Sequence, residues 1–166
     1  MEVVSDLREV MRRWVAGVVI ITSMDQSQRH GMTVNSFTSV SITPPMVSFT
    51  LSNSARTFTI LSKSVLVGIT LLHQGQRDLS ERFAGKSGGA DRFSGLSTFT
   101  LQTGVPLIQG GMAYLEGKVI HHFDMPTSTL FIAEVVSMAK EDDMEPLVYF
   151  NRDYHRLLNE HNPINP

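Results

Sequence analysis

The 166-residue chain contains no cysteine, which excludes disulfide bonds, thiolate nucleophiles, iron–sulfur clusters and zinc–thiolate sites. Charged residues make up only 18%, below the roughly 25% of a typical soluble domain, and a shared interface would help explain this shortage. Fourteen Lys and Arg against sixteen Asp and Glu give a net charge of −2, which argues against a nucleic-acid partner because a basic surface is then expected.

Long apolar runs are also missing from the chain. None approaches the ~18–20 residues of a membrane span, and the charged start MEVVSDLREV lacks the apolar centre of a signal peptide. We therefore expect a soluble, cytoplasmic protein that binds neither nucleic acid nor membrane. Its length suits a single domain over residues 1–166.

The N-terminal segment has the pattern of a short amphipathic helix. Asp6 and Glu9 resemble a capping box, and Gly17 is a plausible end. The apolar side chains that share one helical face are Leu7, Val10, Met11 and Trp14.

The rest of the chain reads as short strands separated by turn signals. The predicted strands cover residues 18–23, 32–41, 46–51, 65–72, 97–102, 112–123, 129–138 and 147–150. Residues 24–31 are predicted to form a turn, 57–62 and 74–83 short helices, and 84–95 a glycine-rich loop. This pattern predicts a mainly β protein built on a closed or nearly closed antiparallel barrel.

Several catalytic motifs are absent or occur in the wrong context. G-x-G-x-x-G occurs nowhere, so there is no Rossmann fingerprint. Residues 85–89 formally match G-x-S-x-G and the end of a P-loop, but a predicted helix precedes them where a nucleophile elbow needs a strand. His121 and His122 are adjacent in a predicted strand and would point to opposite faces. We predict no metal site and no hydrolase.

Three polar segments interrupt the apolar pattern and together suggest a nucleotide site. In the predicted strand around residues 31–37, Thr33 and Asn35 would share one face and could read the edge of a flavin. The alternative is an ordinary half-buried strand whose Thr and Asn are already hydrogen-bonded.

The second segment places hydroxyls and Arg56 at the start of a predicted helix, where free N–H groups and the helix dipole favour a phosphate. An ordinary Ser or Thr N-cap beside a solvated Arg is the alternative. The third segment, residues 83–86, ends a helix; Phe83 could pack on a ring or belong to the core, and Lys86 could add positive potential or be solvated.

These segments occur in the order found in a known family. WVAGVVIITS, GMTVNSFTSVSITPPMVSFTL, S-x-S-A-R-T-F, LSERFAG, GVPLIQGGMAYLEGKV, LFIAEV and PLVYFNRDY, from about Trp14 to Tyr154, resemble the flavin reductase family with the FMN-binding split-barrel fold. Its members are the reductase components of two-component flavin monooxygenases. The resemblance implies a Greek-key antiparallel split β-barrel, a homodimer, FMN or FAD as the flavin, and NADH or NADPH as the electron donor.

The resemblance also implies a set of cofactor-binding residues. They are Met32, Thr33, Asn35, Ser36, Ser52, Ser54, Ala55, Arg56, Thr57, Phe83, Ala84, Gly85, Lys86 and Tyr154. Many relatives carry Gly-Asp-His where this chain has Pro126-Thr127-Ser128, so Ser128 replaces a histidine that lies near the nicotinamide. Relatives also often have Cys at the position of Gly117.

The expected reaction transfers a hydride from nicotinamide C4 to flavin N5, and the cofactor carries the chemistry. Reduced flavin would then serve a monooxygenase or another acceptor such as ferric iron. Because the histidine at position 128 is absent, a flavin carrier, sensor or electron relay with little reductase activity is the alternative. A split barrel that oxidises pyridoxamine phosphate is a third possibility.

Overall fold

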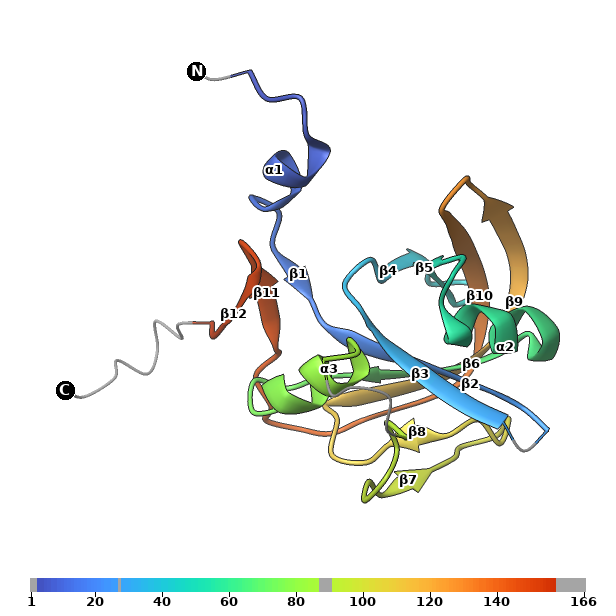
Figure 1. The fold of residues 1–166 in the computed structure, drawn as a ribbon. Helices are drawn as coiled ribbons and strands as arrows, with labels where there is room; N and C mark the ends of the chain where they lie inside the picture. The colour runs from blue at the N-terminus through green and yellow to red at the C-terminus, as the bar shows by residue number, and fades with distance from the viewer. Residues whose placement is uncertain (1–2, 27, 87–90, 158–166) are drawn as a thin grey trace.

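The computed structural model describes residues 3–26, 28–86 and 91–157, and its centre is one curled antiparallel sheet (Figure 1). The strand order is β3-β2-β6-β9-β10-β5-β4. The bounds are β2 Val19–Asp25, β3 Gln28–Val34, β4 Thr38–Ser41, β5 Met46–Ser52, β6 Leu66–Leu71, β9 Ala113–Asp124 and β10 Ser128–Lys140. The two edge strands, β3 and β4, follow each other in the chain, so the sheet must curl until its edges come together.

The side chain of Ser36, which lies between β3 and β4 in the chain, bonds to Thr50 of β5. Its Oγ accepts a hydrogen bond from the Thr50 backbone N–H at 3.0 Å and donates to the Thr50 carbonyl at 3.2 Å. No strand ladder joins β3 to β4 or β5 among the described residues. The prediction of a mainly β split barrel is therefore confirmed.

Smaller elements surround the barrel. A three-stranded sheet has the order β1-β11-β12, with β1 Ala16–Gly17, β11 Val148–Phe150 and β12 Asp153–His155, and β7 Thr98–Phe99 pairs with β8 Leu107–Ile108. The helices are α1 Leu7–Met11, α2 Arg56–Ser64 and α3 Arg77–Phe83. Within the described residues, no helix has the length and hydropathy needed to cross a membrane.

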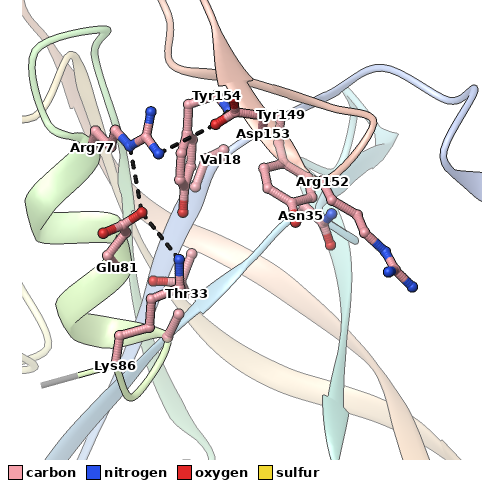
Figure 2. A pocket seen from close by; sticks show the side chains of 11 residues that line it. Val18, Thr33, Asn35, Arg77, Glu81, Lys86, Tyr149, Arg152, Asp153 and Tyr154 are labelled. Atoms are coloured by element: carbon pink, nitrogen blue, oxygen red, sulfur yellow. Dashed lines mark hydrogen bonds and ion pairs between the residues drawn. The ribbon is translucent and has the colours of Figure 1, made fainter.

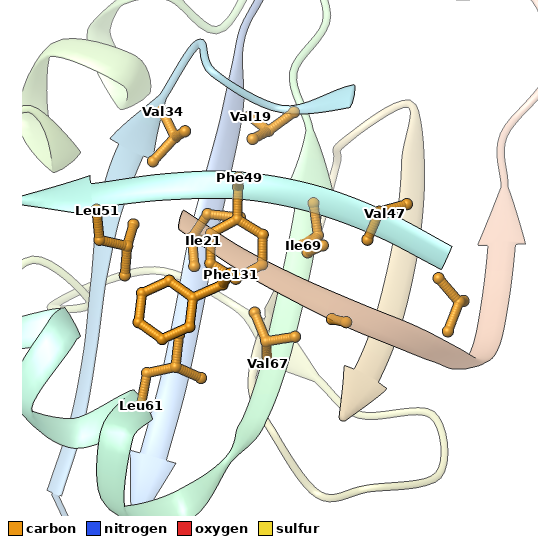
Figure 3. Close-up of a cluster of buried hydrophobic side chains, with 12 residues drawn as sticks. Val19, Ile21, Val34, Val47, Phe49, Leu51, Leu61, Val67, Ile69 and Phe131 are labelled. Carbon is orange, nitrogen blue, oxygen red and sulfur yellow. The ribbon is translucent and has the colours of Figure 1, made fainter. Parts of the chain in front are cut away.

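The first half of strand β2 separates two hydrophobic cores, which explains why residues 18–21 are apolar without alternation. Ile21 points into the barrel, where Phe49 and Phe131 stack with their ring centroids 5.5 Å apart (Figure 3). Ile20 points the other way, into a cluster that includes Phe83 of α3. Successive side chains of a strand face opposite sides, so a segment buried on both faces is apolar at every position or, as at Thr22 and Ser23, has its hydroxyls hydrogen-bonded.

The long strand predicted over residues 32–41 is wrong in its bounds. The polar residues 24–31 mostly belong to the β2–β3 hairpin, because β2 continues to Asp25 and β3 begins at Gln28. Residues 35–37 leave the strand and form the corner that carries the chain across the barrel opening. Asn35 and Ser36 therefore do not alternate with Thr33 along one strand.

Other element predictions also need correction. Only Thr98–Phe99 of the strand expected over residues 97–102 forms a strand. The N–H groups of residues 101–103 donate to the Glu116 carboxylate and not to a neighbouring strand. Helix α3 starts at Arg77 rather than at residue 74, and β1, β8 and β12 lie outside the predicted strands. Residues 87–90, part of the predicted glycine-rich loop and of both motif matches, lie outside the described residues.

The N-terminal helix forms, but it ends early, and none of its residues is buried against the part of the chain that the structure describes. Asp6 caps α1 by accepting the Arg8 N–H at 2.9 Å. The helix ends at Met11, and Gly17 lies in β1 instead of ending it. The predicted apolar stripe is exposed, with Leu7 at 71% and Trp14 at 68% of their full accessibility.

Candidate functional site

Two neighbouring pockets open beside β3 and share Thr33 and Ala84 as lining residues. The first, which we call the α2 pocket, has a volume of about 370 Å³ and is lined by His30, Met32, Thr33, Ser54, Ala55, Arg56, Thr57, Phe83, Ala84 and Arg92. The second, the hairpin pocket, has about 230 Å³ and is lined by Val18, Thr33, Asn35, Arg77, Glu81, Ala84, Lys86, Tyr149, Arg152, Asp153 and Tyr154 (Figure 2).

The α2 pocket lies at the N-terminus of α2, where β5 ends and the chain turns into the helix. The N-cap is Ala55, and among the described residues no side chain caps the first turn. Ser52 and Ser54 bond to each other through their hydroxyls at 2.9 Å, so the alternative of an ordinary Ser or Thr N-cap does not apply. The helix dipole and the N–H groups of the first turn therefore favour an anion at this position.

The loop before α2 is held by the hairpin that joins β9 to β10. The Asn53 N–H donates to the Thr127 carbonyl at 3.1 Å, and Asn53 Nδ2 donates to the Met125 carbonyl at 3.0 Å. Thr129 Oγ1 donates to Asn53 Oδ1 at 2.8 Å. These bonds fix the position of the helix N-terminus relative to the barrel.

Arg92 joins β3 to the end of α3 on the other side of the α2 pocket. Its Nη1 donates to the Gly31 carbonyl at 2.9 Å and to the Phe83 carbonyl at 2.8 Å. A glycine suits position 31 because a Cβ there would lie 2.8 Å from Cε1 of Phe83. Burial lowers the pKa of Arg92, but a guanidinium stays charged at neutral pH.

His30 lines the α2 pocket together with Arg56 and Arg92, and its imidazole is neutral. Its Nδ1 is 2.7 Å from Oγ1 of the fully buried Thr57. Burial lowers the pKa of His30 to about 4, and the positive charges of Arg92 and Arg56 act in the same direction. At pH 7 the α2 pocket therefore presents two guanidinium groups and an uncharged imidazole.

The hairpin pocket combines aromatic and charged side chains. Tyr154 bonds through its hydroxyl to Ser80 Oγ at 2.8 Å, and the Arg77 guanidinium lies over the Tyr154 ring, 5.2 Å from its centroid. Glu81 pairs with Lys86 at 3.1 Å and with Arg77 at 3.4 Å; the hydrogen bond from Lys86 is the main reason that the pKa of Glu81 lies below its ordinary value. The Arg152 guanidinium points away from this cluster (Figure 2).

Most of the predicted cofactor-binding residues line one pocket or both. Met32, Ser54, Ala55, Arg56, Thr57 and Phe83 belong to the α2 pocket, Asn35, Lys86 and Tyr154 to the hairpin pocket, and Thr33 and Ala84 to both. The hydroxyl of Thr33 already donates to the Ser80 carbonyl at 2.6 Å. The ring of Phe83 is fully buried and packs edge-on against Phe93, so its core interpretation applies.

Ser36, Ser52, Gly85 and Ser128 line neither pocket. The first of them closes the barrel through Thr50. Gly85 has φ of +90° just after α3 and lies against Arg92. Ser128 begins β10 directly opposite Ser52 of β5.

Sequence reasoning missed several lining residues: His30, Arg92, Arg77, Glu81, Arg152 and Asp153. His30 fell in a predicted turn and Arg92 in a predicted loop, where polar residues are ordinary. Their partners are distant in the chain, so no local pattern marks them. Within the described ranges, no three His, Asp or Glu side chains lie together as a metal site requires.

Comparison with known proteins agrees with this geometry. The family described as "Flavin reductase like domain" matches residues 11–158. The chain is 34% identical to the FMN reductase (NADH) RutF of Stutzerimonas stutzeri over 92% of this chain and 87% of that protein.

Two solved structures are similar in fold and sequence. NADH:FAD oxidoreductase SgcE6 of Streptomyces globisporus C-1027 matches with a TM-score of 0.89 and 28% identity, over 96% of this chain and 99% of that one. The styrene monooxygenase flavin reductase of Pseudomonas putida S12 matches with a TM-score of 0.82 and 31% identity, over 98% of this chain and 100% of that one.

Proposed function

Because the chain belongs to the flavin reductase family, we propose that it is an NADH-dependent flavin reductase in which residues 1–166 form a single domain. Bound flavin supplies the hydride-accepting N5 atom. We favour NADH over NADPH as the electron donor, because these similar proteins are named as NADH enzymes. No side chain has to act as a nucleophile, which agrees with a chain that has no cysteine.

The α2 pocket is the observation that carries this proposal. It combines an uncapped helix N-terminus with Arg56, Arg92 and the hydroxyl of Ser54 in a space of about 370 Å³. A phosphate monoester carries close to two negative charges at pH 7, which the two guanidinium groups would balance. We place the flavin phosphate in this pocket.

The hairpin pocket suits the less charged part of the flavin. Since Thr33 and Ala84 line both pockets, a ribityl chain that passes them would bring the ring toward Asn35 and Tyr154. Asn35 has both a donor and an acceptor for the edge of the ring. The role of the protein is then to orient the ring for the nicotinamide.

Absorbance spectroscopy and steady-state kinetics test this function. We expect FMN to bind and NADH oxidation to depend on added FMN. Riboflavin should bind more weakly because it lacks the phosphate. A protein that binds FMN in stoichiometric amounts but oxidises neither NADH nor NADPH would instead be a flavin carrier, sensor or electron relay. That second candidate is supported by Ser128, which replaces the nicotinamide-proximal histidine of many relatives.

FMN is the proposed cofactor, and FAD is the alternative since similar proteins are named for each. One similar structure is the reductase of a styrene monooxygenase, which supports a flavin-dependent monooxygenase as the acceptor of reduced flavin. A cytosolic location stays a prediction.

The proposal includes a homodimer. Seven apolar side chains of the described N-terminal arm are exposed in the single chain: Val3, Val4, Leu7, Val10, Met11, Trp14 and Val15. The arm projects away from the barrel (Figure 1), and a second copy would cover these residues and remove their apolar surface from water. Sedimentation of a monomer at micromolar concentration would contradict this part.

A further inference from the structure

One residue of the α2 pocket has a role that the family resemblance does not assign. Resting on the phosphate site proposed above, we propose that His30 recognises the flavin phosphate as a neutral hydrogen-bond donor. Thr57 holds the imidazole in the tautomer that carries its proton on Nε2, and this N–H faces the bound phosphate. His30 thereby contributes to the preference for phosphorylated flavin over riboflavin.

The tautomer follows from the hydrogen bond between His30 and Thr57. Thr57 is fully buried in the first turn of α2, and its Oγ1 lies 2.7 Å from His30 Nδ1. Among the described residues, Oγ1 of Thr57 makes this one hydrogen bond. A buried hydroxyl proton needs an acceptor, so Thr57 donates, Nδ1 accepts, and the ring proton resides on the opposite nitrogen.

The charges around His30 favour its neutral form. Arg56 of α2 and Arg92 of the segment that follows residue 90 both lower the pKa of His30 by their positive charge. Asp91 of that segment acts in the opposite direction and is outweighed. Burial first, and then the two guanidinium groups, place the pKa of His30 at about 4. A third cation between two arginines would add repulsion, whereas a neutral N–H adds a hydrogen bond to the phosphate without further charge.

The first test compares FMN and riboflavin as ligands. We expect His30→Phe, which keeps a ring but has no donor, to lower the ratio of FMN affinity to riboflavin affinity roughly tenfold, since the lost bond is to a charged group. His30→Gln should retain most of the ratio because its amide can donate. His121→Gln is the matched control, because His121 is an exposed residue of β9, and it should not change the ratio.

The second test reads the tautomer of His30 directly by nuclear magnetic resonance. Nitrogen chemical shifts of the wild-type FMN complex should show a protonated Nε2 and a bare Nδ1 from pH 6 to 8. Thr57→Val should abolish that preference. Titration calorimetry in buffers of different ionisation enthalpy should give the same proton uptake for wild type and His30→Gln. A doubly protonated His30 in the complex would overturn the inference.

The two proposals fail in different ways. If wild type bound FMN and riboflavin equally, the phosphate site itself would be wrong, and this inference would fall with it. If Arg56→Ala reduced FMN affinity but His30→Phe left the FMN-to-riboflavin ratio unchanged, the reductase site would stand and the role of His30 would be refuted.

Discussion

Replacement of Glu116 by Gln should destabilise this protein strongly, although the two side chains are almost the same size. Glu116 lies on β9 and is fully buried. Its carboxylate accepts backbone N–H bonds from Leu101 at 2.6 Å, from Gln102 at 2.8 Å, and from Thr103. One oxygen serves the first donor and the other oxygen serves the remaining two.

A glutamine at this position has only one acceptor oxygen. In its better orientation it keeps the Gln102 and Thr103 donors and turns an NH₂ group toward the Leu101 N–H. A buried donor without a partner costs about 1–3 kcal/mol, and neutral hydrogen bonds are weaker than those to a charge. We expect a loss of roughly 2–4 kcal/mol in the free energy of unfolding and a Tm lower by about 10 °C.

The effect should depend on pH in a defined direction. Burial alone would raise the pKa of Glu116, but the backbone donors of Thr103, Leu101 and Gln102 outweigh it and hold the pKa below its ordinary value of 4.5. A carboxyl group whose pKa is lower in the folded state stabilises the fold above its unfolded pKa and loses this contribution as the pH falls through the folded value. The gap between wild type and Glu116→Gln should be constant from pH 8 to 5 and shrink in more acidic solution.

Chemical denaturation at several pH values measures this gap. Glu134→Gln is the matched control, because Glu134 lies on the adjacent strand β10 and is exposed. The control should change stability by less than about 0.5 kcal/mol. Equal effects of the two substitutions, or a gap for Glu116→Gln that persists unchanged to pH 3, would refute the reasoning.

Three further substitutions test the site and its supports. Arg56→Ala should weaken FMN binding roughly 10- to 100-fold by fluorescence titration, because it removes a charge-assisted contact; an unchanged Kd in a folded variant would exclude Arg56 from the site. Ser36→Ala should lower stability by about 1 kcal/mol, through the lost bonds to Thr50, and leave FMN affinity unchanged; the opposite pattern in melting and binding assays would contradict its role in barrel closure. Gly31→Ala should cost about 1–3 kcal/mol by overpacking against Phe83, and Phe83→Leu in the same chain should recover part of this loss in thermal melts.

The sequence alone determined the elements whose signals are local. The β-branched run of β2, the polar residues before α2 and the apolar spacing of α3 follow from burial and turn preferences within a few residues. Those signals were enough to predict that the protein is mainly β. The order of the polar segments was enough to identify the resemblance to flavin reductases.

Only the tertiary structure decided which side chains meet in the pockets. His30 contacts a residue 27 positions away, Arg92 one 61 positions away, and Ser80 bonds to Tyr154 across 74 positions. These contacts depend on how far the sheet curls and where its edges come together. Short-range patterns in a sequence report burial and turns, and they carry no information about which distant strand becomes a neighbour.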